Sequence, residues 1–513
     1  MQVNTEPAAR RRALLQSAAL GAVLLGVTLT ASPARALSFT AGDLVVSSST
    51  YAGTASTVTV GQALPGGGPA THDGTLPGVF LNSAVDGTFG ITSPTALTEI
   101  NPGTGAVVGT LAIPPSDLVT SFSSKSEGSL NLSPDGHTLT FVGYKAGVNE
   151  LDISNDNTPA AIDPKNPDTA GPTFRAIAEV NANGDIKVTT TNAFSGDNGR
   201  GAILGSNGLL YAVGNAGQTK KPPASVTLGA GAQIVVPGTV ATATTLGVQP
   251  AGVYNVTQNS LPADKTAKDN NFRGVTINDN TLYVSKGSGG NGINGVYQVG
   301  AAGSLPTAAS VNAAIAAGNP TITLLPGFPA VPAGTTDSSL YSFGLFFANP
   351  TTLYVGDEGP QDLNADPNAG LQKWSLEGGS WHLDYTLQNG LGLDTPYTVA
   401  GLGYDIATTG LRDITGHVNA DGTVSLYGVT ATYGTDPADG DPGADPNEIV
   451  KITDLLDATA LPGGESFSTL VGPQFGVVER GVAFAPVPEP ASIALFGVSL
   501  VGLGLLRRRS TCA

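Results

Sequence analysis

Apolar, β-prone stretches recur along the chain, and each is divided by a short turn of Gly, Pro, Asn or Asp. Two such runs around a tight turn are typical of a β-hairpin. Six segments follow this pattern, and they begin at Gly78, Ser129, Gly201, Phe272, Gly344 and Ile414. Their starts lie 51, 72, 71, 72 and 70 residues apart. Because four of these five intervals are nearly equal, we predict repeated structural units rather than unrelated hairpins.

A seventh unit is divided between the two ends of the repeat region. Residues 481–486, GVAFAP, have the pattern of a first strand, and residues 42–61, GDLVVSSSTYAGTASTVTVG, have the pattern of a second and a third strand. A ring of sheets leaves no open edge when its last sheet takes strands from both chain ends. Residues 37–486 therefore resemble a seven-bladed β-propeller, an all-β fold closed by combining N- and C-terminal strands.

The repeat units are longer than the 40 to 50 residues of compact propeller repeats, so we expect long loop insertions. The turn at 101–105 predicts an outer hairpin over 95–113, and the turn at 181–185 predicts a second one. The surplus residues fall in loops at 152–173, 217–247 and 300–337. Within the last of these, the periodicity of AASVNAAIAAG predicts a surface helix over 308–318.

The N-terminal 36 residues have the organisation of a secretory signal peptide. Three arginines at 10–12 precede a mostly apolar run from Ala13 to Thr30, and Ala34 and Ala36 form an A-x-A cleavage site. Mature protein is therefore expected to begin at Leu37. Arg11 and Arg12 also fit a twin-arginine signal, so both the twin-arginine and the general secretory route stay open.

A short apolar segment follows the propeller region, in a tail that comprises residues 487–513. No charged residue occurs from Ala491 to Leu506, and sixteen helical residues span only ~24 Å of a hydrocarbon core about 30 Å thick. The arginines at 507–509 follow directly, and a positive cluster beside an apolar helix is retained on the cytoplasmic side. We therefore predict a single C-terminal transmembrane helix, with the body of the protein exported.

Pro488, Glu489 and Pro490 stand just before this helix, where two prolines hold the backbone extended. Together with the glycine-containing apolar segment and Arg507, Arg508 and Arg509, they resemble the PEP-CTERM sorting signal of Gram-negative bacteria. The resemblance implies recognition by an exosortase-type protease, removal of the tail, and delivery to the cell envelope or an exopolysaccharide matrix, after transient anchoring in the inner membrane. The alternative is an ordinary C-terminal anchor.

Composition and charge limit the partners of the exported body. The only cysteine, Cys512, lies beyond the arginine cluster, so the body contains no disulfide. Charged residues make up 12% of the chain, and 69 glycines favour turns and strands. Removing residues 1–36 and 488–513 deletes net charges of +3 and +2, so the formal charge of −17 becomes −22. A body this acidic excludes binding to nucleic acid or anionic lipid by overall electrostatics.

Catalytic motifs are absent from the sequence: there is no G-x-S-x-G, no H-E-x-x-H and no phosphate-binding P-loop. Residues 287–292 match G-x-G-x-x-G by letter, but the next residues continue as a strand, so no helix N-terminus faces a phosphate. The four histidines are scattered, and His137 is expected to be a solvated turn residue.

Two acidic loops at 357–370 and 436–448 share the tetrapeptide Ala-Asp-Pro-Asn and should project from the same rim. Oxygen donors alternate in the first loop as they do in a calcium loop; they are Asp362, Asn364, Asp366 and Asn368. Pro367 and Lys373 stand where an EF-hand needs Gly and a bidentate Glu, which excludes an EF-hand. We expect a solvated acidic loop, with a looser calcium site as the alternative and no firm cofactor.

Two functions of different classes follow. The sorting tail and the lack of a catalytic motif favour a non-enzymatic propeller that binds or organises exopolysaccharide or a surface partner. The alternative is a hydrolase or lyase, with or without calcium, whose site lies in the mouth of the propeller. Its candidate residues are Asp357, Glu358, Asp436 and Asp439.

Overall fold

The structure is a computed structural model that describes residues 38–156, 173–215, 231–242, 248–252, 271–287, 292–319, 321–331, 340–360, 362, 364, 366–434 and 442–489. Several predictions therefore lie outside the described residues. They are the signal peptide with Ala34 and Ala36, the apolar tail with Pro490 and Arg507 to Arg509, and the acidic residues Asp436 and Asp439. In the described ranges, no helix is long and apolar enough to cross a membrane.

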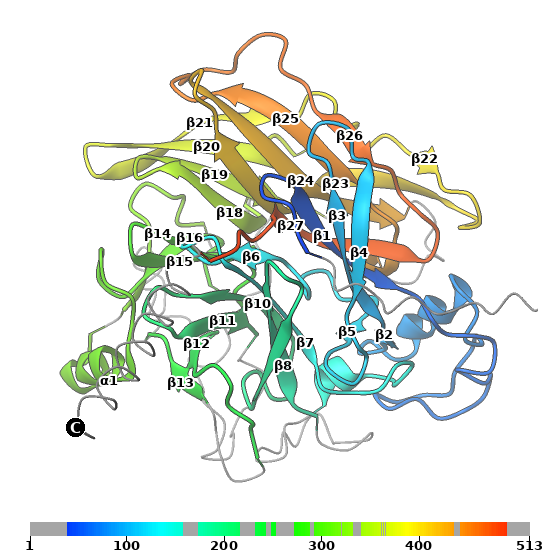
Figure 1. The fold of residues 1–513 in the computed structure, drawn as a ribbon. Helices are drawn as coiled ribbons and strands as arrows, with labels where there is room; N and C mark the ends of the chain where they lie inside the picture. The colour runs from blue at the N-terminus through cyan, green and yellow to red at the C-terminus, as the bar shows by residue number, and fades with distance from the viewer. Residues whose placement is uncertain are drawn as a thin grey trace, which may run out of the picture. The chain divides into compact units, whose positions relative to one another are not determined.

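The described residues form six antiparallel sheets of four or five strands, which can be followed in Figure 1. The first three sheets are β6 (Asn131–Leu132), β7 (Thr138–Tyr144), β8 (Arg175–Asn181) and β9 (Ile186–Thr191); β10 (Gly199–Leu204), β11 (Leu210–Gly214), β12 (Ala232–Val235) and β13 (Val248–Pro250); and β14 (Val275–Asn278), β15 (Thr281–Lys286), β16 (Gly295–Val299) and β17 (Ile322–Leu324).

The other three sheets include the one that joins the two ends of the body. They are β18 (Ser342–Asn349), β19 (Thr352–Asp357), β20 (Gly370–Glu377) and β21 (Ser380–Leu387); β22 (Tyr397–Thr398), β23 (Asp405–Val418), β24 (Thr423–Gly434), β25 (Ile449–Leu455) and β26 (Ser468–Val471); and β27 (Val477–Phe484), β1 (Leu44–Thr50), β3 (Thr95–Ile100) and β4 (Val107–Ala112).

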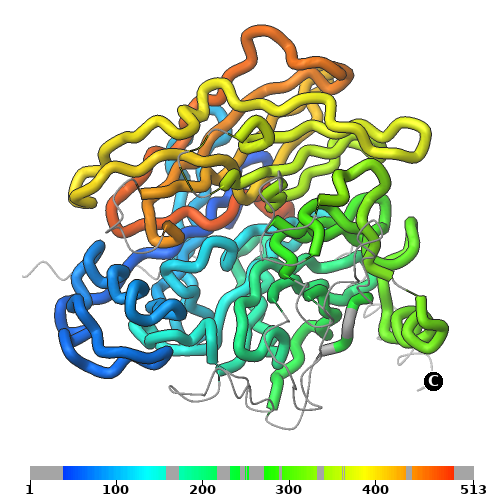
Figure 2. Tube along the Cα trace, turned by 180° about the vertical axis from the view of Figure 1, so that it is seen from behind, coloured from blue at the N-terminus to red at the C-terminus, as the bar shows by residue number. Residues whose placement is uncertain are grey.

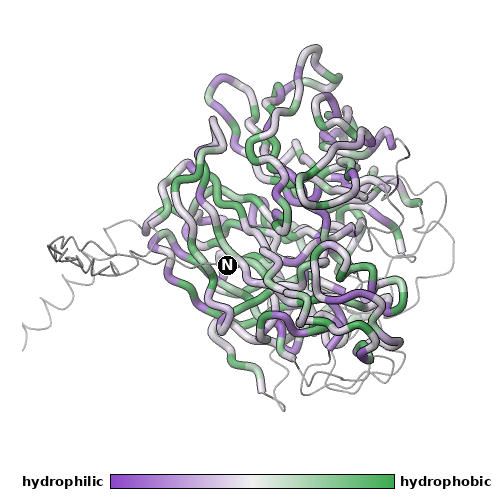
Figure 3. The backbone as a smooth tube through the Cα atoms, turned by 90° about the vertical axis from the view of Figure 1, so that its right-hand side faces the viewer, coloured by the Kyte–Doolittle hydropathy of each residue, from purple (hydrophilic) through white to green (hydrophobic). Residues whose placement is uncertain are grey.

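The six sheets are the blades of a propeller-like ring. The inner strands β6, β10, β14, β18, β23 and β27 each contact the next one, and β27 contacts β6. Six hydrophobic clusters each combine residues of two neighbouring blades, so every blade interface has its own core. Hydrophobic stretches (green in Figure 3) run through the sheets between polar turns. The all-β, propeller-like prediction is thereby confirmed.

The predicted blade count of seven is wrong, because the segment that begins at Gly78 is not a hairpin. It forms the 3₁₀ helix η1 (Gly78–Ala84), followed by a two-stranded sheet of β2 (Thr92–Ser93) and β5 (Thr120–Ser121). The Asn82 side chain accepts the backbone N–H of Thr71 at 2.8 Å and donates to the Val79 carbonyl at 2.8 Å, which favours a local turn over a strand.

Apolar residues of this segment form a separate core instead of a blade. Phe80 stacks on Phe122 with ring centroids 5.7 Å apart, and Tyr51 packs edge-on against both rings. The segment from Tyr51 to Ile91 therefore forms a lobe at the side of the ring, seen in blue in Figure 2. Its start is also the one that departs from the common interval, at 51 residues instead of 70 to 72.

The prediction that one blade combines both chain ends agrees with the strand pairing. β1 lies between β27 and β3, and Val46 is paired with Val482. Residues 51–61 form turns rather than the predicted third strand, because β3 takes that place. The predicted outer hairpin at 95–113 is present as β3 and β4.

The long insertions contain more secondary structure than the sequence predicts. The predicted loop at 217–247 includes β12, and the loop at 300–337 includes β17. The predicted helix is present as α1 (Ala308–Ala317). Thr307 caps its N-terminus by accepting the N–H of Ser310, and Gly318 ends it in a left-handed conformation.

Candidate functional site

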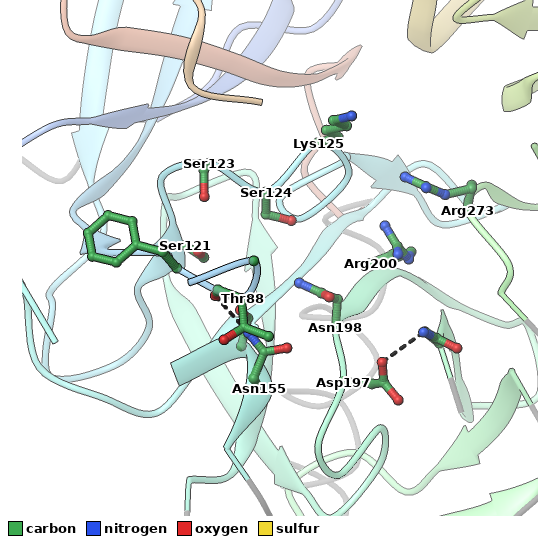
Figure 4. A pocket seen from close by; sticks show the side chains of 14 residues that line it. Thr88, Ser121, Ser123, Ser124, Lys125, Asn155, Asp197, Asn198, Arg200 and Arg273 are labelled. Carbon is green, nitrogen blue, oxygen red and sulfur yellow. Dashed lines mark hydrogen bonds between the residues drawn. The ribbon is translucent and has the colours of Figure 1, made fainter. Parts of the chain in front are cut away.

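A polar cavity of about 460 Å³ opens at one end of the ring (Figure 4). The loops that enter the inner strands β6, β10 and β14 contribute most of its lining. The lobe contributes three residues, and the segments that follow β7 and β11 contribute the others. The lining consists of Gly87, Thr88, Phe89, Ser121, Ser123, Ser124, Lys125, Ser154, Asn155, Asp197, Asn198, Arg200, Asn215 and Arg273. Most of these residues carry hydroxyl, amide or charged groups, so the cavity is built for a polar ligand.

Arg200 reaches the cavity from an irregular position at the start of β10. The pairing of β10 with β11 shifts register between Gly199 and Gly201, so Arg200 lies in a β-bulge. A bulge redirects a side chain out of the regular alternation of the strand. A Cβ atom at Gly199 would lie 2.7 Å from Cγ1 of Val142, so glycine permits the close approach of the neighbouring blade.

The guanidinium groups of Arg200 and Arg273 converge on one hydroxyl group. Nη1 of Arg200 donates to Oγ of Ser126, and Nη1 of Arg273 lies 3.3 Å from the same oxygen. Arg273 also lies over the ring of Phe343, 4.8 Å from its centroid. Both arginines are 7% exposed, so two like charges share a largely buried position.

Burial disfavours the charged form of both arginines. Burial lowers the pKa of Arg200, although Glu127 and Asp197 oppose this effect. The pKa of Arg273 is lowered further, first by burial and then by the neighbouring charge of Arg200. Guanidinium groups stay protonated in proteins, so the positive charge persists and favours a nearby anion.

Nearby carboxylates are engaged with other donors. Glu127 accepts the N–H of Ser121 at 2.8 Å and Nδ2 of Asn198 at 2.9 Å, and it also accepts the hydroxyl of Tyr144. Asp197 accepts Nδ2 of Asn215 at 2.7 Å (Figure 4). Over the described ranges, the two ion pairs are Lys373 with Asp454 and Arg412 with Glu358, and neither involves Arg200.

Sequence reasoning missed these arginines, although the chain carries a signal for them. One position just before or within each inner strand recurs through the six blades, as Glu127, Arg200, Arg273, Phe343, Arg412 and Arg480. The intervals are 73, 73, 70, 69 and 68 residues, and glycine follows in all cases except Arg412. At Gly274 a Cβ atom would lie 2.1 Å from the Phe343 carbonyl oxygen, so the crowding between blades requires glycine there.

Of the candidate catalytic carboxylates, Asp357 and Glu358 are described, and neither lines the cavity. Asp357 is fully buried and accepts the N–H of Tyr341 at 2.7 Å and Nε2 of Gln372 at 2.9 Å, so it fixes the end of β19. Burial raises its pKa well above the ordinary value. Glu358 pairs with Arg412 at 3.3 Å. In the part of the chain that the structure describes, no three His, Cys, Asp or Glu residues are grouped as metal ligands.

The predicted calcium loop makes local turns at its described residues. Asp362 Oδ1 accepts the N–H of Asn364 at 3.0 Å, and Asp366 Oδ1 accepts the N–H of Asn368 at 2.8 Å. Such bonds are typical of Asx-turns. Calcium at Asp362, Asn364, Asp366 and Asn368 stays a prediction.

The start of the sorting tail lies at the other end of the ring. The N–H of Val487 donates to the Gly136 carbonyl at 2.8 Å, and the Val487 carbonyl lies 2.8 Å from Nδ1 of His137. Pro488 and Glu489 then line a second cavity of about 430 Å³ beside the β6–β7 and β8–β9 turns. His137 is thus a half-buried partner of the tail rather than the purely solvated residue that we predicted.

Strand direction places the two cavities at opposite ends of the ring. The segment that contains β6 runs from Ser126 and Glu127, beside the first cavity, to the turn at 133–137 beside the second. β27 runs the same way, from Arg480, which donates to the Ser121 carbonyl at 3.1 Å, to Val487. The tail therefore leaves the body on the face opposite to the first cavity, the one that Arg200 and Arg273 line. We call this first cavity the axial cavity.

The comparisons with known proteins decide how this tail functions. Residues 486–509 match the PEP-CTERM protein-sorting motif. The motif is the signal for processing by exosortase, and it implies export and sorting to the cell envelope. No curated protein matches this sequence.

Several solved structures resemble the chain at low identity. A glucose dehydrogenase has 12% identity and a TM-score of 0.32, with 66% of this chain and 89% of that chain covered. A GH74 enzyme of Niastella koreensis has 14% identity and a TM-score of 0.31, with 75% and 52% covered. The haemagglutinin-neuraminidase of parainfluenza virus 5 has 10% identity and a TM-score of 0.31, with 77% and 84% covered. None of these likenesses assigns a substrate to this chain.

Proposed function

We propose that this exported, envelope-sorted protein binds a polysaccharide of the extracellular matrix in its axial cavity without turning it over. The observation that carries the proposal is the lining of the cavity, where Ser121, Ser123 and Asn155 lie opposite Lys125, Arg200 and Arg273 (Figure 4). Sugar hydroxyl groups both donate and accept hydrogen bonds, so they match hydroxyl and amide side chains of this kind.

The position of the tail supports display to the matrix. Because Val487 leaves the ring on the far face, the cavity points away from the membrane while the protein is still tethered. Binding and sorting therefore use different surfaces, and the protein binds its ligand before or after the tail is removed.

The chemistry of the lining favours binding over turnover. Glycoside hydrolysis ordinarily needs two carboxyl groups on either side of the bond that breaks. Asp197 is the one carboxylate among the lining residues, and guanidinium groups stay protonated at neutral pH, so they do not act as general bases. The alternative, a hydrolase or lyase, is distinguished from a binding protein by the experiment below, which measures the release of sugar ends together with binding.

The experiment measures co-sedimentation of the purified protein with exopolysaccharide from the cells that make it, together with the release of new sugar ends. We expect binding and no release. Ser124→Trp should fill the axial cavity and abolish binding, whereas Asn183→Trp, in the cavity on the opposite face, should leave it intact. Release of sugar ends would establish an enzyme, and binding only to another surface protein would contradict the proposal.

A further inference from the structure

The positive side chains of the axial cavity gather on one side of it. In Figure 4, Arg200 and Arg273 lie next to each other on the same side as Lys125, and Ser121, Thr88 and Asn155 lie across from them. Three cations and one carboxylate therefore line the cavity of a protein whose formal charge is −17. A local charge of opposite sign to the whole molecule indicates selection for a specific anionic group rather than for general charge attraction.

Arg200 has hydrogen-bonding capacity that the described protein atoms do not use. Nε of Arg200 is buried without a hydrogen-bond partner in the described residues. The group that Arg200 and Arg273 share is a neutral hydroxyl, Ser126 Oγ. An anionic oxygen is a much stronger acceptor for a guanidinium group, because charge-assisted bonds are about twice as strong as neutral ones.

The pair is also held in place before any ligand arrives. The bulge at Arg200 fixes where its side chain leaves β10, and the ring of Phe343 supports the guanidinium of Arg273. Both arginines are only 7% exposed, so their side chains lose little rotational freedom when a ligand binds. A planar fork with fixed orientation suits a planar acceptor with two oxygens, which is the geometry of a carboxylate.

We infer that Arg200 and Arg273 form a subsite for the carboxylate of an acidic sugar, with Lys125 adding charge at the rim. The hydroxyl and amide groups across the cavity receive the sugar hydroxyls. This inference rests on the proposed function, because it names the class of polysaccharide that the cavity takes: a polymer that contains uronic acid residues.

The test uses three probes of equal length and linkage: a β-1,4-oligoglucuronate, the neutral cello-oligosaccharide and its sulfated form. Affinities are measured by calorimetry with the purified full chain. We expect the oligoglucuronate to bind at least tenfold more tightly than the neutral probe, and more tightly than the sulfated one. Equal affinity for the acidic and neutral probes would overturn the subsite but leave polysaccharide binding intact. Binding of none of the three would overturn both.

Variants separate the fork geometry from simple charge. Arg200→Gln should weaken oligoglucuronate binding about 10- to 100-fold, as expected for a lost bond to a charged group. Arg200→Lys keeps the charge but loses the fork, so it should recover only part of the affinity. Both changes should weaken binding of the neutral probe much less than binding of the oligoglucuronate, because the neutral probe has no carboxylate.

Two further variants guard against loss of folding. Lys125→Gln changes a partly exposed rim residue and should cost a few-fold in affinity for the oligoglucuronate, with an unchanged melting temperature. Lys187→Gln removes a charge from the opposite cavity and should have no effect on binding. If the Lys125 and Arg200 variants bind all three probes as the parent does, the carboxylate subsite does not exist.

Discussion

At one end of the ring, Arg200 and Arg273 are buried against a single serine hydroxyl, and Nε of Arg200 has no partner among the described residues. At the other end, the N–H and C=O groups of Val487 both have partners, in Gly136 and His137. Side chains in the turns there also accept hydrogen bonds from the backbone of the same turn, since Asn181 Oδ1 accepts the N–H of Asn183 at 2.9 Å. The two ends differ in whether the protein completes its own polar contacts.

This difference separates a binding surface from an attachment surface. A buried polar group without a partner costs free energy, and a ligand that supplies the partner recovers that cost. A segment whose backbone groups are satisfied is instead held in a defined place. The cavity end is therefore prepared for something absent from the chain, and the opposite end is prepared to hold the tail.

Strand β27 runs from the cavity end, at Arg480, toward the tail end, at Val487. The largest effect should come from removing part of this strand. Deleting residues 481–486 removes Val482 and Ala483 from the cores that β27 shares with its neighbours, and it opens the edge of β1. Exposed strand edges promote aggregation, so we expect loss of the monomer and of a cooperative melt. Size-exclusion chromatography and thermal unfolding measure this.

The control for this deletion is removal of Gly463 and Gly464 from the exposed loop before β26, which should leave the ring closed. A 481–486 deletion that remained monomeric and melted like the parent would contradict closure by β1 and β27.

Changing Glu489 to Ala should uncouple the two ends. We expect the precursor to keep its tail, because Glu489 belongs to the sorting motif, while oligoglucuronate binding at the opposite end stays unchanged. Arg200→Gln should do the reverse and leave processing intact. Immunoblots of membrane and released fractions, with intact mass, measure both. Leu500→Val, a conservative change in the apolar segment, serves as the control and should be processed normally; equal processing of the Glu489 variant would show that the tail is only an anchor.

The contact between the lobe and Asp152 should make the stability of the protein depend on pH. Burial and the neighbouring Asp86 raise the pKa of Asp152 to about 8, and Asp152 Oδ1 accepts the N–H of Gly90 at 2.8 Å. The folded state thus holds a proton that the unfolded chain releases near pH 4. Between about pH 4 and 8 the unfolded chain binds fewer protons, so stability falls as the pH rises through this window.

Asp152→Asn removes this titration and keeps the acceptor for Gly90. We expect a melting temperature about 1 to 3 °C above the parent at pH 8.5, which corresponds to about 1 to 3 kcal/mol, and a smaller difference at pH 4. The exposed Asp457→Asn is the control and should follow the parent at every pH. A difference that does not depend on pH would show that Asp152 is not protonated in the folded state.

The smallest effect should come from His137→Ala at the tail end. This change removes the partner of the Val487 carbonyl but leaves the bond from the Val487 N–H to Gly136, at a cost of about 1 kcal/mol. Because the tail is then held less firmly against the ring, we expect processing to become up to about twofold faster. His382→Ala, at an exposed position on β21, should process like the parent. Slower processing would indicate that the protease needs the tail in its docked position.

Local patterns in the sequence determined most strands and the tail. Five of the six predicted hairpins are present, because alternating apolar residues around Gly, Asn or Asp turns favour a hairpin wherever they occur. Helix α1 follows from Thr307 and Gly318, which begin and end it through bonds within a few residues. The sorting motif is likewise contiguous, so it needs no fold to be recognised.

Contacts between distant residues decided the blade count and the cavity. The segment at Gly78 has a hairpin pattern, but Phe80 packs on Phe122, 42 residues away, and the local bonds of Asn82 complete a 3₁₀ helix. Arg200 and Arg273 lie 73 residues apart and meet at Ser126 only because neighbouring inner strands converge on the axis. The recurring position that carries them is visible in the sequence. Its spacing alone, however, does not show at which end of the ring these residues lie or which charged residues are neighbours. Those depend on strand direction and blade order, which only the closed ring establishes.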